Sequence, residues 1–238
     1  LRPLGIQTIG VPAGDSAALD AAIARAGNLR IVYLETPANP TLRMVDIRRA
    51  VEAARRHPDA PLVVVDNTFL GPAFQHPLAL GVDLVVYSGT KYLNGFSDLL
   101  AGVVLSADEE MVTHLRGTRA ILGNILQPDE CWLLDSRLSP VRLRMNRQSK
   151  NAQRIAESLV DHRALRCVLY PSLFTDPEQI RIRDAQCDFP GGIMTLDLKG
   201  GKKAAFTFLR SLRILRDAVS LGGVESLSCH PRTTTHSE

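Results

Sequence analysis

The first two-thirds of the chain alternates short apolar runs with helix-like stretches, and this alternation constrains the fold more than any other feature. The runs rich in β-branched residues are 30–35, 61–68, 82–89 and 101–106. Residues 44–57 between them, and 107–122 after them, show apolar spacing typical of helices. Continuous apolar strands separated by helices are typical of a mostly parallel sheet covered on both faces. We therefore expect an α/β layer.

The pattern changes at Ser139. Residues 139–162 predict one long helix, with Ser139 as its cap and Pro140 at its first position. Short strands within 166–171 and 191–201 and a helix over 202–212 follow, which indicates a smaller α+β unit. We expect an α/β domain over 1–140 and a small C-terminal domain over 141–238.

The composition excludes several classes of protein. Arginines are interspersed with acids and the net charge is only +3, so a nucleic-acid partner is not expected. The four cysteines form no C-x-x-C pair and the histidines lack ligand spacing, which argues against metal sites and disulfides and favours the reducing cytoplasm. No apolar run is long enough for a membrane span, and no signal peptide is evident. The chain begins at Leu1 inside an ordered pattern, so we expect an internal fragment of a longer protein.

Polar side chains follow each of the first three predicted strands. The first strand is followed by Glu35-Thr36-Pro37-Ala38-Asn39-Pro40, the second by Asp66-Asn67-Thr68, and the third by Ser88-Gly89-Thr90-Lys91. Ligands of open α/β sheets bind beyond the carboxyl ends of the strands. One site could therefore combine a carboxylate, an amide, hydroxyls and one of only five lysines in the chain.

This combination suits pyridoxal 5'-phosphate. Lys91 would supply the amine for a Schiff base, Asp66 would hold the ring nitrogen protonated, and hydroxyls of the Ser-Gly-Thr segment would hold the phosphate. Each residue also has a plainer interpretation, since Asp66 could cap a helix or pair with an arginine, and Lys91 could lie on the surface. A P-loop is excluded because Tyr92 follows the lysine, and no G-x-G-x-x-G motif follows a strand.

Four segments resemble one enzyme family over essentially the whole chain. "YLETPANP", "VVVDNTF", "YSGTKYLNGFSDLLAG" and "AVSLGGVESLSCHP" together are similar to the Cys/Met-metabolism (trans-sulfuration) family of pyridoxal-phosphate enzymes. That family contains methionine γ-lyase, cystathionine γ-synthase, cystathionine β- and γ-lyases and O-acylhomoserine sulfhydrylases. The resemblance implies a type I, aspartate-aminotransferase-like fold and a homotetramer built as a dimer of dimers.

The resemblance also assigns roles to single residues. The expected cofactor contacts are Lys91, Asp66, Ser88, Thr90, Asn39 and Thr68, the expected substrate contacts are Asn39 and Ser220, and no metal ligand is expected. Lys91 and Asp66 are the expected catalytic residues. Glu35 is expected to shape a turn, and Arg232 to lie on the surface.

The activity implied by the resemblance is a lyase or transferase reaction on a sulfur amino acid or an O-acylhomoserine. The segments look most like methionine γ-lyase, which performs γ-elimination; γ-replacement as in cystathionine γ-synthase, and cystathionine β- or γ-lyase activity, remain alternatives. The family's N-terminal phosphate loop and C-terminal carboxylate-binding arginine have no counterpart in residues 1–238. A non-catalytic remnant that only assembles with a partner is therefore the alternative from a different class. We expect Cys131 to be an inert residue of a buried helical segment.

Overall fold

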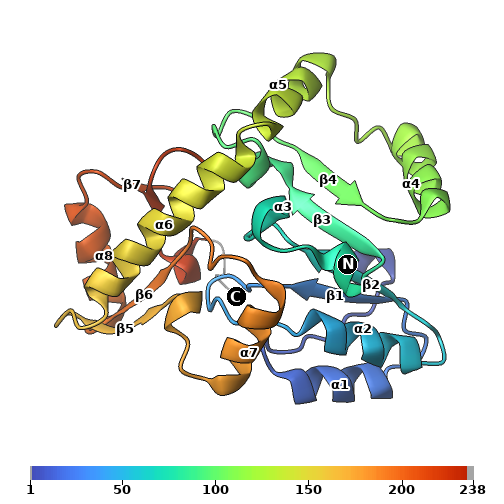
Figure 1. Ribbon diagram of the computed structural model, residues 1–238, viewed down its shortest axis with the longest axis horizontal. Coiled ribbons are helices and arrows are strands. Elements are labelled where there is room, and N and C mark those ends of the chain that lie inside the picture. Colours follow the sequence, from blue (N-terminus) through green and yellow to red (C-terminus); the bar gives the residue numbers. More distant parts are fainter. Residues whose placement is uncertain (1, 235–238) are drawn as a thin grey trace.

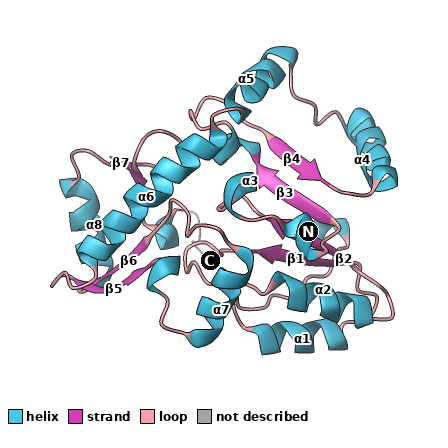
Figure 2. Ribbon diagram, viewed as in Figure 1, coloured by secondary structure: helices cyan, strands magenta, loops and turns pink. Residues whose placement is uncertain are grey.

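The computed structural model describes residues 2–234 and confirms the expected fold class (Figures 1 and 2). The helices are α1 (Ser16–Arg25), α2 (Ile47–Arg56), α3 (Gly71–Phe74), α4 (Glu109–Leu122), α5 (Pro128–Leu138), α6 (Val141–Leu159), α7 (Pro177–Gln186) and α8 (Gly201–Ser211). The strands are β1 (Ile31–Glu35), β2 (Leu62–Asp66), β3 (Leu84–Ser88), β4 (Gly102–Leu105), β5 (Leu165–Leu169), β6 (Thr195–Leu198), β7 (Arg216–Asp217) and β8 (Leu227–Ser228).

The main sheet has the order β1-β2-β3-β4. The first three strands are parallel, and β4 pairs antiparallel with β3. The crossovers between parallel strands contain α2 and then α3, as the alternation of the sequence predicts. Because β1, β2 and β3 run in the same direction, the polar residues that follow them meet at one edge of the sheet.

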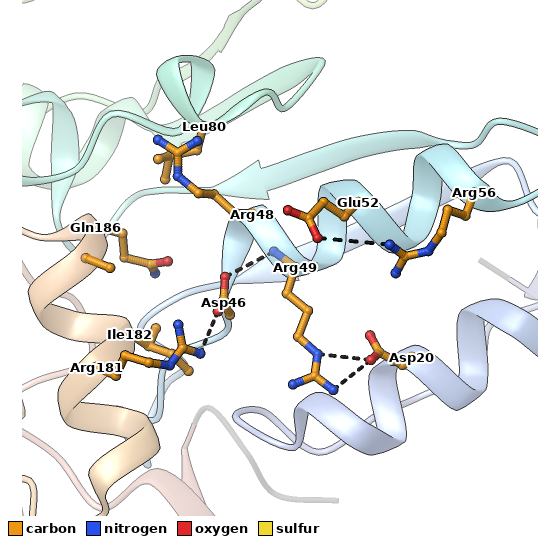
Figure 3. A pocket seen from close by; sticks show the side chains of 11 residues that line it. Asp20, Asp46, Arg48, Arg49, Glu52, Arg56, Leu80, Arg181, Ile182 and Gln186 are labelled. Carbon is orange, nitrogen blue, oxygen red and sulfur yellow. Dashed lines mark hydrogen bonds and ion pairs between the residues drawn. The ribbon is translucent and has the colours of Figure 1, made fainter.

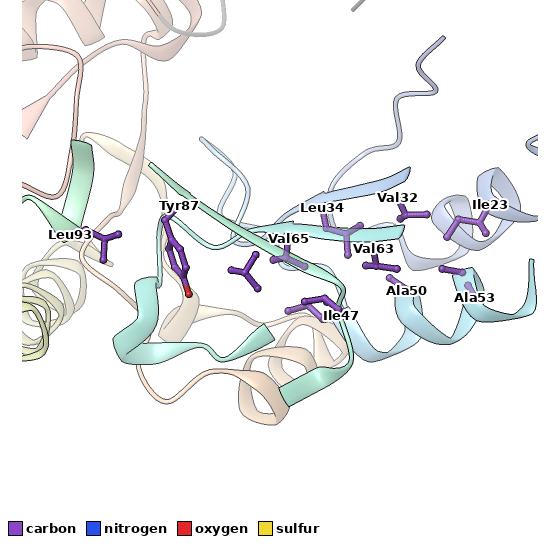
Figure 4. Close-up of a cluster of buried hydrophobic side chains, with 13 residues drawn as sticks. Ile23, Val32, Leu34, Ile47, Ala50, Ala53, Val63, Val65, Tyr87 and Leu93 are labelled. Carbon is purple, nitrogen blue, oxygen red and sulfur yellow. The ribbon is translucent and has the colours of Figure 1, made fainter. Parts of the chain in front are cut away.

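One face of this sheet is covered by α1 and α2 (Figure 1). Figure 4 shows the buried cluster between them, which contains Val32 and Leu34 of β1, Val63 and Val65 of β2, and Ile47 of α2. Each of these side chains is at most 6% exposed. The alternation of side chains along a strand therefore places every second residue of β1 and β2 in the core.

Within the described residues, the expectation that both faces are covered holds at the centre of the sheet, where Val64 of β2 is 5% exposed, and fails at the outer strands β1 and β4. Ile31 and Tyr33, the alternate residues of β1, are 52% and 58% exposed, and Val104 of β4 is 49% exposed. The sequence misleads here because β1 is apolar on both faces, although only one face has packing partners in residues 2–234.

The long helix α6 runs from the sheet to the smaller unit (Figure 1). It begins at Val141, with Pro140 at the N-cap and no side-chain cap, so the predicted Ser139 cap is wrong. Ser139 instead has helical dihedral angles at the end of α5. The expected domain boundary between 140 and 141 lies at this junction, and it stays a prediction.

The smaller unit contains the antiparallel pair β5–β6, and α7 returns from it to the main sheet. The Gln179 side chain accepts a hydrogen bond from the Met44 N–H at 2.7 Å and donates one to the Met44 carbonyl at 3.0 Å. Gln186 makes the same two-way contact, donating to the carbonyl of Val45 and accepting from the N–H of Ile47. These amides satisfy buried backbone groups and fix the segment that follows β1.

Candidate functional site

The carboxyl ends of β2 and β3 lie side by side in the sheet. Asp66 pairs with Val86 in the parallel register. Just beyond the strands, the Ser88 N–H donates a hydrogen bond to Thr68 Oγ1 at 2.8 Å. The structure therefore brings the Asp66 segment and the Ser88–Lys91 segment together, as the sequence predicts.

Lys91 lies in a π-helical turn, η3 (Gly89–Leu93), immediately after β3. Its φ and ψ of −89° and −121° are not helical, and its half-buried amine donates a hydrogen bond to Ser220 Oγ at 3.1 Å. The segment that carries Ser220 lies tightly against this turn, because a Cβ on Gly222 would lie 2.6 Å from the Tyr92 nitrogen. Lys91 and Ser220, which are 129 residues apart in the sequence, thus form one site.

The Asp66 carboxylate is half-buried and is held by two donors. The Thr68 N–H donates to Oδ1 at 3.0 Å, and the Tyr33 hydroxyl donates to Oδ2 at 3.2 Å. Burial, the negative charge of Asp66 and this hydrogen bond raise the pKa of Tyr33 to about 12. The sequence motifs did not predict this contact of Tyr33. The alternation of side chains along β1 could have indicated it, since every second residue of the strand lies on the same face.

The hydroxyls of Ser88 and Thr90 differ in their surroundings. Among the described residues, no hydrogen bond engages the Ser88 side chain. Thr90 Oγ1 accepts from the Ala101 N–H at 2.9 Å and lies 3.4 Å from the Ala101 carbonyl. Gly89 permits this approach, because a Cβ there would lie 2.8 Å from the Ala101 Cβ. Thr90 therefore ties the turn to the start of β4.

Asn39 lies in the loop after β1. Its backbone N–H donates to Glu35 Oε1 at 2.8 Å, which confirms that Glu35 shapes this turn. Thr195 of β6 donates to the Pro40 carbonyl at 2.6 Å and fixes the loop from the other side. No hydrogen bond joins Asn39 to Asp66 or Lys91 within residues 2–234, so its expected contacts stay predictions.

Arg144 of α6 holds the Lys91 turn by hydrogen bonds, and no sequence motif indicated this role. Its guanidinium donates to the carbonyls of Tyr92 (2.8 Å), Leu93 (3.2 Å) and Arg137 (3.0 Å). Burial and the neighbouring Arg137 lower the pKa of Arg144. Gly95 leaves the space, because a Cβ there would collide with the guanidinium.

A separate charged groove lies between α1, α2 and α7, away from the Lys91 turn (Figure 3). It encloses about 490 Å³, and ion pairs neutralise much of its charge. Arg49 pairs with Asp20 at 2.8 Å, Arg181 with Asp46 at 2.7 Å, and Arg56 with Glu52 at 4.0 Å.

The described part of the chain has no cluster of His, Cys, Asp or Glu suited to a metal ion. None of its helices is both long and apolar enough to cross a membrane.

All four cysteines are free, and the expectation that Cys131 is buried is wrong: the segment is helical, but Cys131 is exposed and Trp132 is 69% exposed. No described element covers this side of α5, which has no buried residue. Arg232 is exposed, as expected, whereas the "THS" block at 235–237 lies outside the described residues.

The chain is similar to known proteins in both sequence and fold. The model of the Cys/Met metabolism PLP-dependent enzyme family matches residues 1–238. The chain is 42% identical to an L-methionine gamma-lyase from Pseudomonas deceptionensis over 98% of its own length and 58% of the relative's. It is 37% identical to a cystathionine gamma-lyase from Sus scrofa, covering 98% of this chain and 56% of that protein.

Among solved structures, a cystathionine gamma synthase from Xanthomonas oryzae pv. oryzae in complex with cystathionine superposes with a TM-score of 0.88 at 39% identity, over 94% of this chain and 57% of that one. The chain thus spans somewhat more than half the length of the relatives it matches. The full-length family match and these similarities confirm the resemblance drawn from the motifs. The chain belongs to the Cys/Met metabolism family of PLP-dependent enzymes.

Proposed function

We propose that this chain provides the cofactor-binding lysine and much of the active site of a pyridoxal-phosphate-dependent enzyme acting on sulfur amino acids. One observation carries the proposal: the half-buried Lys91 amine meets a neutral hydroxyl and no carboxylate of residues 2–234, at the same sheet edge as Asp66. Asp66 likewise has no cationic partner there. Charged groups left without counter-charges at a sheet edge fit a ligand that brings its own.

The donors present fit this cofactor. Lys91 would bond to its aldehyde, and Asp66 would accept a hydrogen bond from its protonated ring nitrogen. The Ser88 hydroxyl is available to a phosphate. Thr90, which accepts from the Ala101 N–H and donates to the Ala101 carbonyl at 3.4 Å, would exchange that donation for one to the phosphate. Thr68, which accepts from the Ser88 N–H, retains its own proton to donate. We propose Asn39 as a further contact, near the ring hydroxyl and the substrate carboxylate.

The chemistry then follows from the side chains. Bound pyridoxal phosphate supplies an aldehyde that captures amines and a ring that accepts electrons. The Lys91 amine, once released by an incoming substrate amine, is the group placed to take the proton from the substrate α-carbon. Ser220 holds that amine in place by the hydrogen bond at 3.1 Å, and we propose that it also contacts the substrate. Asp66 keeps negative charge beside the ring nitrogen, which favours electron withdrawal.

We infer γ-elimination as the reaction: with methionine, the γ-carbon–sulfur bond breaks, a thiol leaves, and water is consumed to give a 2-oxo acid and ammonia. The similarity to an L-methionine gamma-lyase supports this proposal. The similarity to a cystathionine gamma synthase supports the alternative, in which a thiol replaces the γ-substituent of an O-acylhomoserine. Cystathionine β- or γ-lyase activity is a further alternative, and the cystathionine gamma-lyase relative supports its γ form.

Assays of the intact protein with methionine, cystathionine and O-succinylhomoserine plus cysteine separate these reactions. Release of a 2-oxo acid and ammonia from methionine is the expected result. Formation of cystathionine from O-succinylhomoserine without ammonia release would favour γ-replacement. No turnover of any of the three, with cofactor in excess, would contradict the proposal.

We further propose a homo-oligomer, specifically a dimer of dimers, in the cytoplasm. The unburied helices α4 and α5, which expose Ile121 and Trp132, support an assembly contact. The four free cysteines fit a reducing compartment. Analytical ultracentrifugation of the intact protein tests the oligomer, and a monomer at micromolar concentration would contradict it.

A further inference from the structure

The contact between Tyr33 and Asp66 follows from the register of the sheet. Tyr33 of β1 lies opposite Val64 of β2, and Asp66 lies two residues further along β2 on the same face. Such diagonal neighbours are within reach of an aromatic side chain. The Tyr33 hydroxyl accordingly reaches Asp66 Oδ2 at 3.2 Å.

The burial of β1 indicates that this hydroxyl contact is not a by-product of core packing. The core side of β1 consists of Val32 and Leu34, which are 6% and 4% exposed, whereas Tyr33 is on the opposite face and 58% exposed. A phenol on this open face has room to turn towards solvent. Instead it donates to Asp66, a carboxylate that has no arginine or lysine partner within residues 2–234.

The two donors to Asp66 act on different oxygens. The Thr68 N–H fixes Oδ1 and the Tyr33 hydroxyl fixes Oδ2, so rotation of the carboxylate is restricted from both sides. Each oxygen retains a lone pair for a further donor. We propose that Tyr33 is a positioning residue that orients Asp66 towards the ring nitrogen of the cofactor; this inference rests on the proposed function of Asp66.

The protonation of Tyr33 suits this role. Burial, the charge of Asp66, their hydrogen bond and the charge of Glu35 raise its pKa to about 12. Asp66 and Glu35 are the charged groups that act on it, and both disfavour the phenolate. Tyr33 therefore remains a hydrogen-bond donor throughout the neutral and mildly alkaline range.

The test is Tyr33→Phe in the intact protein, with the dissociation constant of pyridoxal phosphate measured by its visible absorbance. Loss of a hydrogen bond to a carboxylate predicts binding weaker by about tenfold. The 1-deaza analogue, in which carbon replaces the ring nitrogen, should bind equally to both proteins. In an Asp66→Asn background, Tyr33→Phe should have no further effect, because the two residues act as a unit. The pH dependence of the visible band should shift in Tyr33→Phe and not in the control.

Tyr170→Phe is the matched control. It removes a phenol that donates to the Gly191 carbonyl at 2.8 Å in the smaller unit, so it should lower thermal stability without changing cofactor binding. An equal loss of affinity for the cofactor and its 1-deaza analogue in Tyr33→Phe would overturn the positioning role. If Asp66→Asn weakens binding and Tyr33→Phe does not, the Tyr33 inference alone fails. If neither variant weakens binding, the proposed function of Asp66 fails as well.

Discussion

The charged groove between α1, α2 and α7 and the edge of the sheet around Lys91 both concentrate ionisable side chains, but they satisfy them differently. In the groove, Asp20 and Asp46 each meet an arginine at less than 3 Å. At the sheet edge, Asp66 meets only a phenol and a backbone amide, and Lys91 meets only a hydroxyl. The first arrangement is complete within the chain, whereas the second leaves opposite charges available to a ligand.

This difference makes the sheet edge, rather than the charged groove, the better candidate for chemistry. Exposed ion pairs contribute little to stability and leave few groups free to react. Half-buried charged groups that are hydrogen-bonded only to neutral groups remain able to bind a charged ligand and to transfer protons. Each prediction below tests whether the two regions differ in this way.

The largest effect is expected from Lys91→Ala. Removal of the amine should abolish covalent attachment of pyridoxal phosphate completely, because no other described lysine lies at the sheet edge. Absorbance of the purified intact protein measures this, with Lys150→Ala on an exposed position of α6 as the control. A lysine-bound cofactor that persists in Lys91→Ala would contradict the assignment.

Asp66→Asn and Asp46→Asn compare the two regions by the same chemical change. Loss of the Asp66 charge should lower kcat by about 100-fold, as loss of a preorganised electrostatic group does. Asp46→Asn removes an ion pair to Arg181 but leaves an amide that still caps α2, so it should cost about 0.5 kcal/mol of stability and leave kcat unchanged. Steady-state kinetics and urea unfolding separate the two results. Equal losses of kcat in the two variants would contradict the proposed difference between the sheet edge and the charged groove.

Arg144 is a third charged side chain whose hydrogen-bond partners are all neutral backbone carbonyls. Arg144→Lys cannot reach three carbonyls with one ammonium, so the free energy of unfolding should fall by about 2 kcal/mol. Arg142→Lys, on an exposed position of the same helix, is the control and should be neutral. Denaturant unfolding of both variants measures the difference. Equal stability of the two variants would show that Arg144 does not hold the Lys91 turn.

The smallest effect concerns Cys187, a thiol kept neutral between the two units. Burial raises the pKa of this thiol from its ordinary value of 9.0 to about 12. Because the folded pKa is the higher one, the thiol stabilises the fold below pH 9, and this contribution is lost as pH rises from about 9 to about 12. Iodoacetamide at pH 8 should modify the exposed Cys167 and spare Cys187 until the protein unfolds. Rapid labelling of Cys187 in the native state, detected by peptide mapping, would refute this.

The sequence predicted the strands well because β1, β2 and β3 are short, continuous and β-branched, with turn residues at their ends. It failed where partners distant in sequence decide the outcome. Ile31 is as apolar as Val32, yet Ile31 is 52% exposed and Val32 only 6%. The Ser139 cap failed because Ser139 belongs to the end of α5.

The candidate site shows the same division. Lys91 and Asp66 follow strands whose direction and order the alternation implies, so their meeting at one edge could be predicted. The family resemblance predicted that Ser220 contacts the substrate, but its hydrogen bond with Lys91 was not predicted, since the two residues lie far apart in the chain. Tyr33 begins the "YLETPANP" segment but was assigned no role there, and Arg144 lies in no motif. Their contacts require the strand register and the packing of α6. The residues that carry the proposed chemistry could thus be predicted from the sequence, whereas the residues that support them could be identified only from the structure.

The most direct test of the account is to load the intact protein with pyridoxal phosphate, reduce it with borohydride and map the modified peptide by mass spectrometry. The account predicts one modified residue, Lys91. A label on a different lysine, or no label with cofactor in excess, would contradict it and would favour a chain that retains the fold of its family without the chemistry.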